Sequence, residues 1–225
     1  MKLEPIVHIE NDFYEKFGIP RQSGIVPLPS KIYFKPEYRV IEAFRGLEGY
    51  SHIWLIWEFS KAIRENWSPT VRQPRLGGNR RMGIFSTRSP FRPNPIGLSV
   101  VKLDEICLHG NYAPYLLVSG ADLMNGTPIY DIKPYLPHID SIPVAKGGFS
   151  ETTANYRLNV VFPDTLQKQI PVHLQVGLIE LLAQDPRPSY QHDSKRIYGF
   201  TFGEWEIRFS VDDNVLTVCE VKHNE

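Results

Sequence analysis

The sequence predicts a mainly β protein, with an N-terminal antiparallel β-barrel followed by a smaller α+β domain. Over the first 140 residues, short apolar runs typical of strands are separated by turns rich in proline and glycine. This stretch has no alternation of strands with long helices and no GxGxxG loop after a strand, which argues against a Rossmann fold. A clear amphipathic helical pattern occurs in the last third, at residues 172–183.

The N-terminal segment is expected to supply two strands joined by a loop. Residues 4–9 and 31–34 predict the strands, and residues 14–29 between them hold three prolines and predict the loop. Residues 37–51 contain a short helical turn around 41–47, which we expect Gly49 to close.

Residues 52–59, HIWLIWEF, form the most apolar strand of the sequence. Their unbroken apolar run predicts burial on both faces, and the two tryptophans favour a place in the core or a subunit interface over cofactor contact. Residues 96–108 and 115–123 predict a hairpin across the turn that joins them. A turn at 125–128 and a short strand at 129–135 complete the expected barrel.

Residues 150–225 are expected to form the second domain, and residues 1–140 the barrel domain. A linker or loop at 137–153 lies at their boundary, and a strand is expected at 156–162. A polar loop follows at 185–196, and three strands are expected between it and the C-terminus.

The region between that strand and the polar loop predicts two helices. The first begins near residue 163, and Pro171 suits the first turn of the second, because proline there forfeits no helical hydrogen bond. Apolar residues recur at helical spacing in the second helix and are expected to pack in the core: Val172, Val176, Ile179 and Leu182.

Charge and composition exclude several classes of protein. The 25 basic and 25 acidic residues balance, so any surface for nucleic acid must be local. Cys107 and Cys219 lie far apart without CxxC or Cys/His spacing, which argues against a disulfide framework and a metal site and fits a reducing cytoplasm. The N-terminus lacks the apolar region of a signal peptide, and no apolar run approaches the roughly 20 residues of a membrane span. We therefore expect a cytoplasmic protein with no metal and no membrane segment.

Residues 72–99 form an arginine-rich stretch that is also rich in turns. No Asp or Glu occurs between Glu65 and Asp104, while four prolines and four glycines shape the backbone. The six arginines are Arg72, Arg75, Arg80, Arg81, Arg88 and Arg92. Such a stretch suits an anionic partner, and the alternative is a solvated basic loop.

Five strings of residues resemble the TsaA/TrmO family of tRNA methyltransferases. They are PRQSG at 20–24, RLGGN at 75–79, GIFSTRSPFRPNPIGLS at 83–99, LMNGTPIYDIKPYLP at 123–137 and LAQDPRPSY at 182–190. The resemblance implies a TsaA-like β-barrel that binds S-adenosyl-L-methionine, usually as a homodimer. It also implies N6-methylation of threonylcarbamoyladenosine, the modified base just 3′ of a tRNA anticodon.

By this resemblance, the contacts to S-adenosylmethionine fall in short, separate stretches. The implied cofactor-binding residues are Pro20, Arg21, Gln22, Phe59, Ser60, Arg88, Leu98, Leu123, Met124, Asn125 and Gly126. Arginine suits the cofactor's carboxylate, and carbonyl oxygens or an aromatic face suit its sulfonium. Ser60 stands where relatives often have histidine.

The methyl acceptor calls for a general base, because the lone pair of a urea-like N6 is delocalised and its proton must leave. The candidate carboxylates in this region are Asp131, within one of the family-like strings, and Asp122, directly before it. Strand alternation places Asp131, Lys133 and Tyr135 on one face, and the resemblance favours a catalytic role for them, with Asp131 as base or sulfonium partner. The alternative is an ordinary surface ion pair between Asp131 and Lys133.

The arginine-rich stretch and the loop at 182–190 supply the residues expected to contact tRNA, and the resemblance places that loop near either the tRNA or the cofactor. They are Arg75, Arg80, Arg81, Arg92, Arg187 and Tyr190. A cation beside an aromatic ring suits a phosphate and a stacked base. The alternative function is a non-catalytic RNA-binding barrel, which needs neither a methyl donor nor a base.

Overall fold

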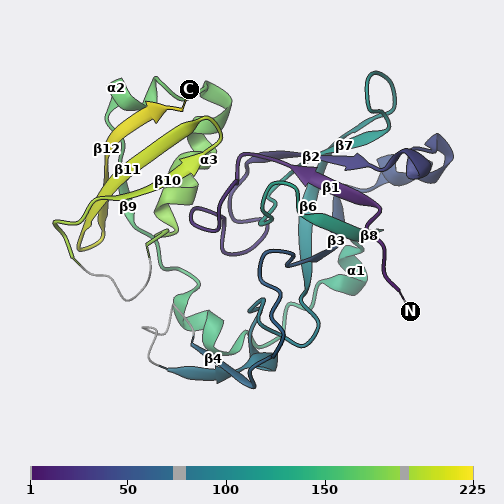
Figure 1. Ribbon diagram of the computed structural model, residues 1–225, viewed down its shortest axis with the longest axis horizontal. Coiled ribbons are helices and arrows are strands. Elements are labelled where there is room, and N and C mark those ends of the chain that lie inside the picture. The colour runs from purple at the N-terminus through teal and green to yellow at the C-terminus, as the bar shows by residue number, and fades with distance from the viewer. Residues whose placement is uncertain (1, 73–79, 188–192, 225) are drawn as a thin grey trace.

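A computed structural model describes residues 2–72, 80–187 and 193–224, and it confirms the mainly β class (Figure 1). Six strands close into an antiparallel barrel in the order β1-β2-β7-β6-β3-β8. Their bounds are Val7–Glu10 (β1), Pro29–Phe34 (β2), His52–Glu58 (β3), Ile96–Cys107 (β6), Tyr115–Ser119 (β7) and Pro128–Pro134 (β8). The predicted hairpin is confirmed, since β6 and β7 are paired neighbours.

Strand β3 shows how a closed barrel uses alternation. Ile53, Leu55 and Trp57 point inward and are at most 5% exposed, whereas Trp54 and Ile56 on the other face are only half-buried. The expectation of burial on both faces is therefore wrong for this strand. A barrel has one interior, so only every second residue of a strand enters it.

Three 3₁₀ helices replace the single helical turn expected after β2. They are η1 (Pro36–Tyr38), η2 (Ile41–Phe44) and η3 (Leu47–Gly49). Gly46 separates the last two with φ of 88°, a conformation that side chains other than glycine rarely adopt.

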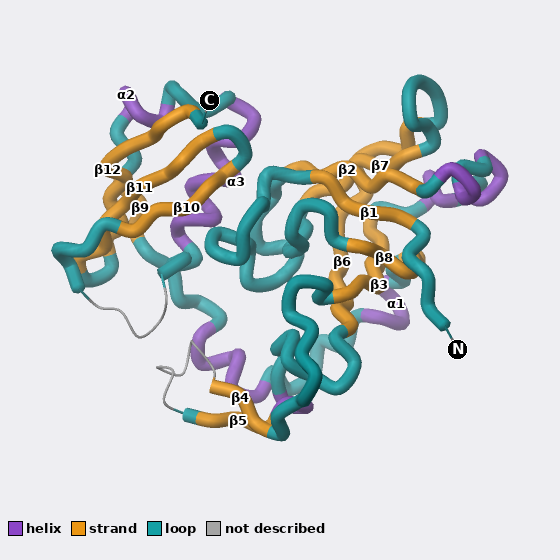
Figure 2. Tube along the Cα trace, in the orientation of Figure 1, coloured by secondary structure: helices purple, strands orange, loops and turns teal. Residues whose placement is uncertain are grey.

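The C-terminal part forms a four-stranded sheet in the order β10-β11-β12-β9, apart from the barrel (Figure 2). Its strands are β9 (Asn159–Val161), β10 (Tyr198–Phe202), β11 (Trp205–Asp212) and β12 (Val215–His223). Helix α1 (Pro137–Asp140) lies beside the barrel, where Trp54 of β3 donates to Asp140, and η6 (Gly148–Thr153), α2 (Asp164–Gln167) and α3 (Val172–Ala183) follow it in the chain. Within the described residues, none of the helices has the length and apolar character required to cross a membrane.

Helix α3 buries a face that contains only part of the expected stripe: Leu182 is fully buried and Ile179 is half-buried. Val172 and Val176 are 81% and 65% exposed, so their predicted place in the core is wrong. The residues buried in the helix are Leu174, Gly177, Leu178, Leu181, Leu182 and Ala183. Gly177 explains the choice of face, because a Cβ there would lie 2.3 Å from Leu28 Cδ2.

The structure has two hydrophobic cores, and the loop before β2 belongs to the second. The first core fills the barrel. The second lies between α3 and the C-terminal sheet, and it also contains Phe13, Val26 and Leu28. Gly18 allows this loop to approach the sheet, since a Cβ there would lie 2.4 Å from the Phe200 ring.

The arginine-rich stretch contains a short hairpin that the sequence did not predict. Strand β4 (Thr70–Arg72) pairs with β5 (Arg81–Gly83), and the 3₁₀ helix η5 (Ile84–Ser86) follows. The guanidinium of Arg81 donates to Thr70 Oγ1 at 2.7 Å and to the Thr70 carbonyl at 3.0 Å, which ties the two strands together.

Candidate functional site

Several family-like stretches meet at one end of the barrel, where β2, β6 and β8 begin and β3 and β7 end. We call this end the barrel mouth, and we define it by residues 20–24, 57–60, 87–89, 95–97, 99 and 120–126. Backbone hydrogen bonds join these segments, from Gly24 N to Gly120 O at 2.8 Å and from Phe59 N to Pro95 O at 2.8 Å. The mouth is therefore a fixed part of the barrel.

Asp122 lies at the centre of the mouth and is held by a chain of hydrogen bonds. Ser99 Oγ donates to Asp122 Oδ1 at 2.6 Å, and Trp57 Nε1 donates to Ser99 Oγ at 3.0 Å. Gly97 makes room for the indole, because a Cβ there would lie 2.2 Å from the Trp57 ring. Together these residues fix the direction in which the Asp122 carboxylate points.

The surroundings of Asp122 affect its charge in opposite directions. Burial raises the pKa of this carboxyl, and burial is the largest effect. The Ser99 hydroxyl, the Arg88 charge and the Ser23 backbone N–H act to lower it, but the net pKa is raised. A partly desolvated carboxylate within reach of a cation is typical of functional sites.

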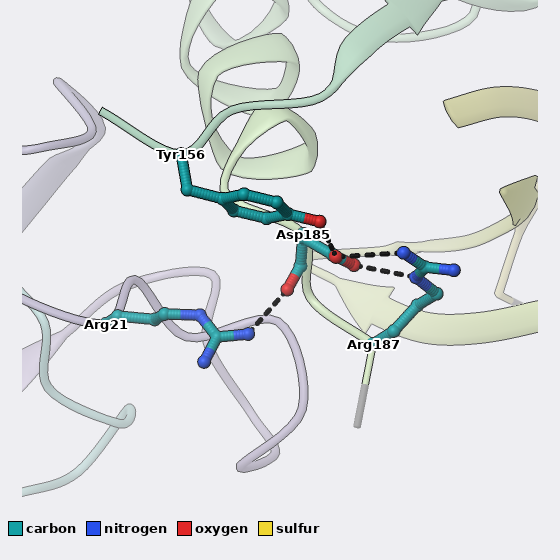
Figure 3. Close-up of polar contacts among 4 residues, drawn as sticks. All are labelled: Arg21, Tyr156, Asp185 and Arg187. Carbon is teal, nitrogen blue, oxygen red and sulfur yellow. Dashed lines mark hydrogen bonds and ion pairs between the residues drawn. The ribbon is translucent and has the colours of Figure 1, made fainter. Parts of the chain in front are cut away.

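Two arginines from separate stretches are linked at the mouth. Arg88 Nη1 donates to Gln22 Oε1 at 2.5 Å, and Gln22 Nε2 donates to the Arg21 carbonyl at 2.5 Å. Arg21 Nη2 in turn donates to the Asp185 carbonyl at 2.6 Å, as Figure 3 shows. The structure thus brings the PRQSG string at 20–24 and the GIFSTRSPFRPNPIGLS string at 83–99 together. Pro20 is buried beside them.

The turn at 123–126 is a rigid platform at the edge of the mouth. Asn11 Nδ2 donates to the Leu123 carbonyl at 2.9 Å, and Asn11 N donates to Asn125 Oδ1 at 3.1 Å. The side chain of Leu123 is fully buried in the barrel core, so only its backbone can face a ligand. Met124 is half-buried, and a Cβ added to Gly126 would meet no atom within 4 Å.

Sequence reasoning missed Asn11 and the partners of Asp122. Asn11 stands where β1 ends, and in the sequence an Asn at a strand end indicates no more than turn chemistry. Trp57 was expected in the core or a subunit interface, and Ser99 lies in a stretch expected only to form one strand of a hairpin. No sequence pattern indicates that these two side chains meet Asp122.

Leu98 is separated from the other implied cofactor residues. It follows Gly97 on β6, is 55% exposed on the outer face of the barrel, and pairs with Ile56. Phe59 remains at the mouth, with its ring 4.2 Å from that of Trp57. Ser60 follows it, and its N–H donates to the Glu58 carbonyl at 2.8 Å.

Asp131, Lys133 and Tyr135 lie together on the outer wall of the barrel. Lys133 Nζ is 3.0 Å from Asp131 Oδ2, and these side chains are 62% and 46% exposed. The Tyr135 ring packs 5.7 Å from that of Trp54. Ile56 pairs with both Asp131 and Leu98, so the outer wall carries these three across neighbouring strands.

The predicted tRNA-binding arginines differ in their surroundings. Arg80 is exposed next to β5, and Arg81 is exposed but bonded to Thr70. Arg92 Nη1 donates to the Thr87 carbonyl at 3.0 Å, which braces its own loop. Arg75 and Tyr190 lie outside the described residues.

Arg187 is buried, which contradicts the expectation of a cation exposed for phosphate. Its side chain is 6% exposed, and its Nε and Nη2 lie 2.8 Å and 3.0 Å from the two carboxylate oxygens of Asp185. A guanidinium occupied in this way has no open surface for a nucleic acid.

The opposite end of the barrel holds an apolar cavity of about 340 Å³ that includes none of the mouth residues. Phe34, Phe44, Leu47 and Tyr50 contribute to its lining, together with Arg45. No carboxylate lines it. Among the described residues, no group of three or more His, Cys, Asp or Glu side chains is placed to hold a metal ion.

Comparison with known proteins gives matches to both parts of the chain. Residues 8–141 match the family model of the tRNA-methyltransferase O N-terminal domain, and residues 156–224 match that of the TrmO C-terminal domain. A tRNA (adenine(37)-N6)-methyltransferase of Escherichia coli K12 is 38% identical over 94% of each chain. A Pseudomonas aeruginosa protein provisionally named an S-adenosylmethionine-dependent methyltransferase is 39% identical, over 92% of this chain and 91% of its own. A crystal structure of TrmO from P. aeruginosa superposes with a TM-score of 0.79 at 32% identity, covering 100% of this chain and 97% of that one.

Replacing Asp122 by asparagine is expected to stabilise the protein at neutral pH. Because the pKa of Asp122 is raised on folding, its stabilising contribution is present at low pH and is lost as pH rises through that pKa. The gain from Asp122→Asn should therefore shrink as the pH falls and the native carboxyl becomes protonated. Urea unfolding at neutral pH and at successively lower pH measures the difference in unfolding free energy between variant and wild type. Asp104→Asn is the exposed control. A loss of stability at neutral pH would mean that the hydrogen bond from Ser99 and the attraction of Arg88 together outweigh burial.

Proposed function

Because the chain belongs to the TrmO family of tRNA methyltransferases, we propose that it methylates N6 of threonylcarbamoyladenosine, directly 3′ of a tRNA anticodon. It is an S-adenosylmethionine-dependent enzyme that acts on adenine N6 of tRNA. The threonylcarbamoyl group of the acceptor is the finer part of the proposal. Cys107 and Cys219 are free thiols, which supports action in a reducing cytoplasm.

The residues of the barrel mouth suit the chemical groups of S-adenosylmethionine. Arg88 and Arg21 would hold its carboxylate, and the Asp122 carboxylate would face its cationic side. Phe59 and the backbone of the turn at 123–126 would border the adenine and the sulfonium. When bound, this cofactor supplies a methyl group carried on a positively charged sulfur.

The convergence of Gln22, Arg88 and Asp122 is the observation that carries the proposal. These residues come from three separate stretches of the sequence, and the barrel places a cation, an amide and a partly buried carboxylate close together. A non-catalytic RNA-binding barrel would not need a buried carboxylate there, because a negative charge repels phosphate. The geometry therefore favours an enzyme over a binding module.

The hairpin of β4 and β5 is the proposed contact for tRNA. Arg72, Arg80 and Arg81 are exposed on it. Trp67 and Phe85 nearby are 50% and 75% exposed, and their ring centroids lie 6.2 Å apart. Cations beside exposed rings suit the phosphates and unstacked bases of an anticodon loop.

Two arginine variants should separate the cofactor site from the tRNA surface. We expect Arg88→Gln to weaken binding of S-adenosylmethionine by about tenfold or more, because a charge-assisted hydrogen bond is lost. Arg80→Gln should leave cofactor binding unchanged and weaken tRNA binding. It should also reduce the steepness of the plot of log tRNA affinity against log salt concentration by about 1. Calorimetry with the cofactor and filter binding of tRNA over a salt series measure the two effects.

Methyl transfer from labelled S-adenosylmethionine to threonylcarbamoylated tRNA tests the proposed acceptor. The same tRNA without the threonylcarbamoyl group is the matched control. Equal transfer to both substrates would show that the threonylcarbamoyl group is not required, and wild-type protein that binds no cofactor at millimolar concentration would refute the proposed function.

Asp131 is the proposed base for the acceptor, with Lys133 and Tyr135 beside it. Its carboxylate is 46% exposed, so a bulky substrate can reach it, whereas Asp122 is engaged with Ser99 inside the mouth. Asp131 would take the proton from N6, and Lys133 would stabilise the carboxylate until that step.

Asp131→Asn should lower the rate of methyl transfer by a factor of about 10² or more while cofactor affinity stays the same, because the amide cannot accept the proton. Single-turnover transfer and calorimetry measure these quantities, and Asp104→Asn serves as a control for loss of an exposed ion pair. An unchanged rate would show that Asp131 and Lys133 form an ordinary surface pair.

We propose a homodimer because two implied site residues, Leu98 and Asp131, lie on the outer wall of the barrel and not at the mouth of the same chain. Leu98, Ile56 and Trp54 leave an apolar face on neighbouring strands, and Asp131 lies at its edge. If a second copy packs against this wall, Leu98 and Asp131 can approach the mouth of the partner. Such packing would reconcile the implied cofactor role of Leu98 with its outward position.

Leu98→Asp should therefore produce a monomer with weakened cofactor binding. A charge on the apolar wall would be desolvated in the dimer, which is costly. Light scattering and calorimetry measure the two effects, and Val172→Asp, exposed on α3, is the control. A wild-type protein that is monomeric at micromolar concentration would contradict the proposal.

A further inference from the structure

Helix α3 ends at a residue whose backbone conformation is unusual for its type. Gln184 is the C-cap, and Asp185 follows with φ of 54°, in the left-handed region that favours glycine. A residue other than glycine keeps this conformation when the surrounding contacts impose it. The contacts of Asp185 therefore indicate why an aspartate occupies this position.

The carboxylate of Asp185 is bound by two other residues, and all three side chains converge in Figure 3. Arg187 Nε donates to Oδ1 at 2.8 Å, Arg187 Nη2 donates to Oδ2 at 3.0 Å, and the Tyr156 hydroxyl donates to Oδ2 at 2.8 Å. Burial alone would raise the pKa of Asp185, but the hydrogen bonds from Arg187 and Tyr156 hold it below its ordinary value. Glycine would relieve the backbone but would make none of these contacts.

The main-chain carbonyl of Asp185 points the other way, toward the barrel mouth. It accepts a hydrogen bond from Arg21 Nη2 at 2.6 Å. Arg21 continues into Gln22, whose Oε1 accepts from Arg88 at 2.5 Å. A short chain of contacts thus leads from the C-terminal domain to the cation at the proposed cofactor site.

We propose that Asp185 and Arg187 are positioning residues, which hold the turn after α3 so that its carbonyl fixes Arg21 for the carboxylate of S-adenosylmethionine. This inference rests on the proposed function and extends it to the C-terminal domain. The buried ion pair sets the turn, the turn sets the carbonyl, and the carbonyl orients the guanidinium of Arg21.

The physical benefit is preorganisation. An arginine side chain has many rotamers, and immobilising it when a ligand binds costs conformational entropy. A carbonyl that already holds Arg21 removes part of that cost. The effect should therefore fall on cofactor affinity and KM, and the transfer rate at saturating cofactor should stay the same.

The full-length variant Arg187→Gln tests the proposal by calorimetry with S-adenosylmethionine and by steady-state kinetics. We expect the dissociation constant and the KM for the cofactor to rise by about tenfold, with kcat unchanged. Arg157→Gln is the matched control, because Arg157 also joins this region to α3, through an exposed ion pair with Glu180 at 2.6 Å. It should bind the cofactor as the wild type does.

A double-mutant cycle shows whether Arg187 acts through Arg21. If it does, Arg21→Gln combined with Arg187→Gln should bind no more weakly than Arg21→Gln alone. Losses that multiply in the double variant, or an unchanged dissociation constant in Arg187→Gln, would overturn the proposal.

Tyr156→Phe covers the case in which Arg187→Gln does not fold. It removes one hydrogen bond to Asp185 from a side chain that is 47% exposed, and we expect cofactor binding to weaken about threefold. Normal binding by Tyr156→Phe would overturn the proposal. Wild-type protein that binds no cofactor would instead refute the proposed function, so the two failures are distinguishable.

Discussion

Closure of the barrel through β8 is the constraint on which the mouth depends. β8 pairs with β3 from Ile53 to Trp57, and with β1 at Val7 and His8. This double pairing leaves the barrel sheet without a free edge, so the ends of its strands stay at fixed separations. Loops that leave these ends must meet, and for this reason Gln22 and Arg88 touch although they are 66 positions apart.

The barrel was predictable because its strands obey a local rule. The turn between β6 and β7 and the short apolar runs beside it can be read from adjacent residues. The inward face of β3 could not be read in this way, because its sequence is apolar on both faces. The buried face of α3 was not predictable in this way. Val176 and Leu178 are equally apolar, and the choice between their faces depends on Leu28, which reaches Gly177 from the distant loop before β2.

The site was predictable as a set of segments but not as a set of contacts. Motif strings identified the loops that meet at the mouth, yet charge alone cannot show where a guanidinium points. Arg92 braces its own loop and Arg187 binds Asp185, so both are engaged within the protein. Leu123 presents its backbone because its side chain fills the barrel core. Such assignments depend on tertiary hydrogen bonds, which single-sequence patterns do not encode.

The loop before β2 belongs to the barrel domain by its position in the sequence, but its apolar side chains pack in the core of the C-terminal domain. Phe13, Val26 and Leu28 belong to the core beneath the C-terminal sheet, although they precede most of the barrel. A fragment cut at the linker would leave these side chains without their apolar neighbours, while the C-terminal fragment would lose part of its own core. The two halves are therefore interdependent in synthesis as well. The second core cannot be completed until β12 has been synthesised, so the loop before β2 lacks these apolar neighbours while the intervening chain is made.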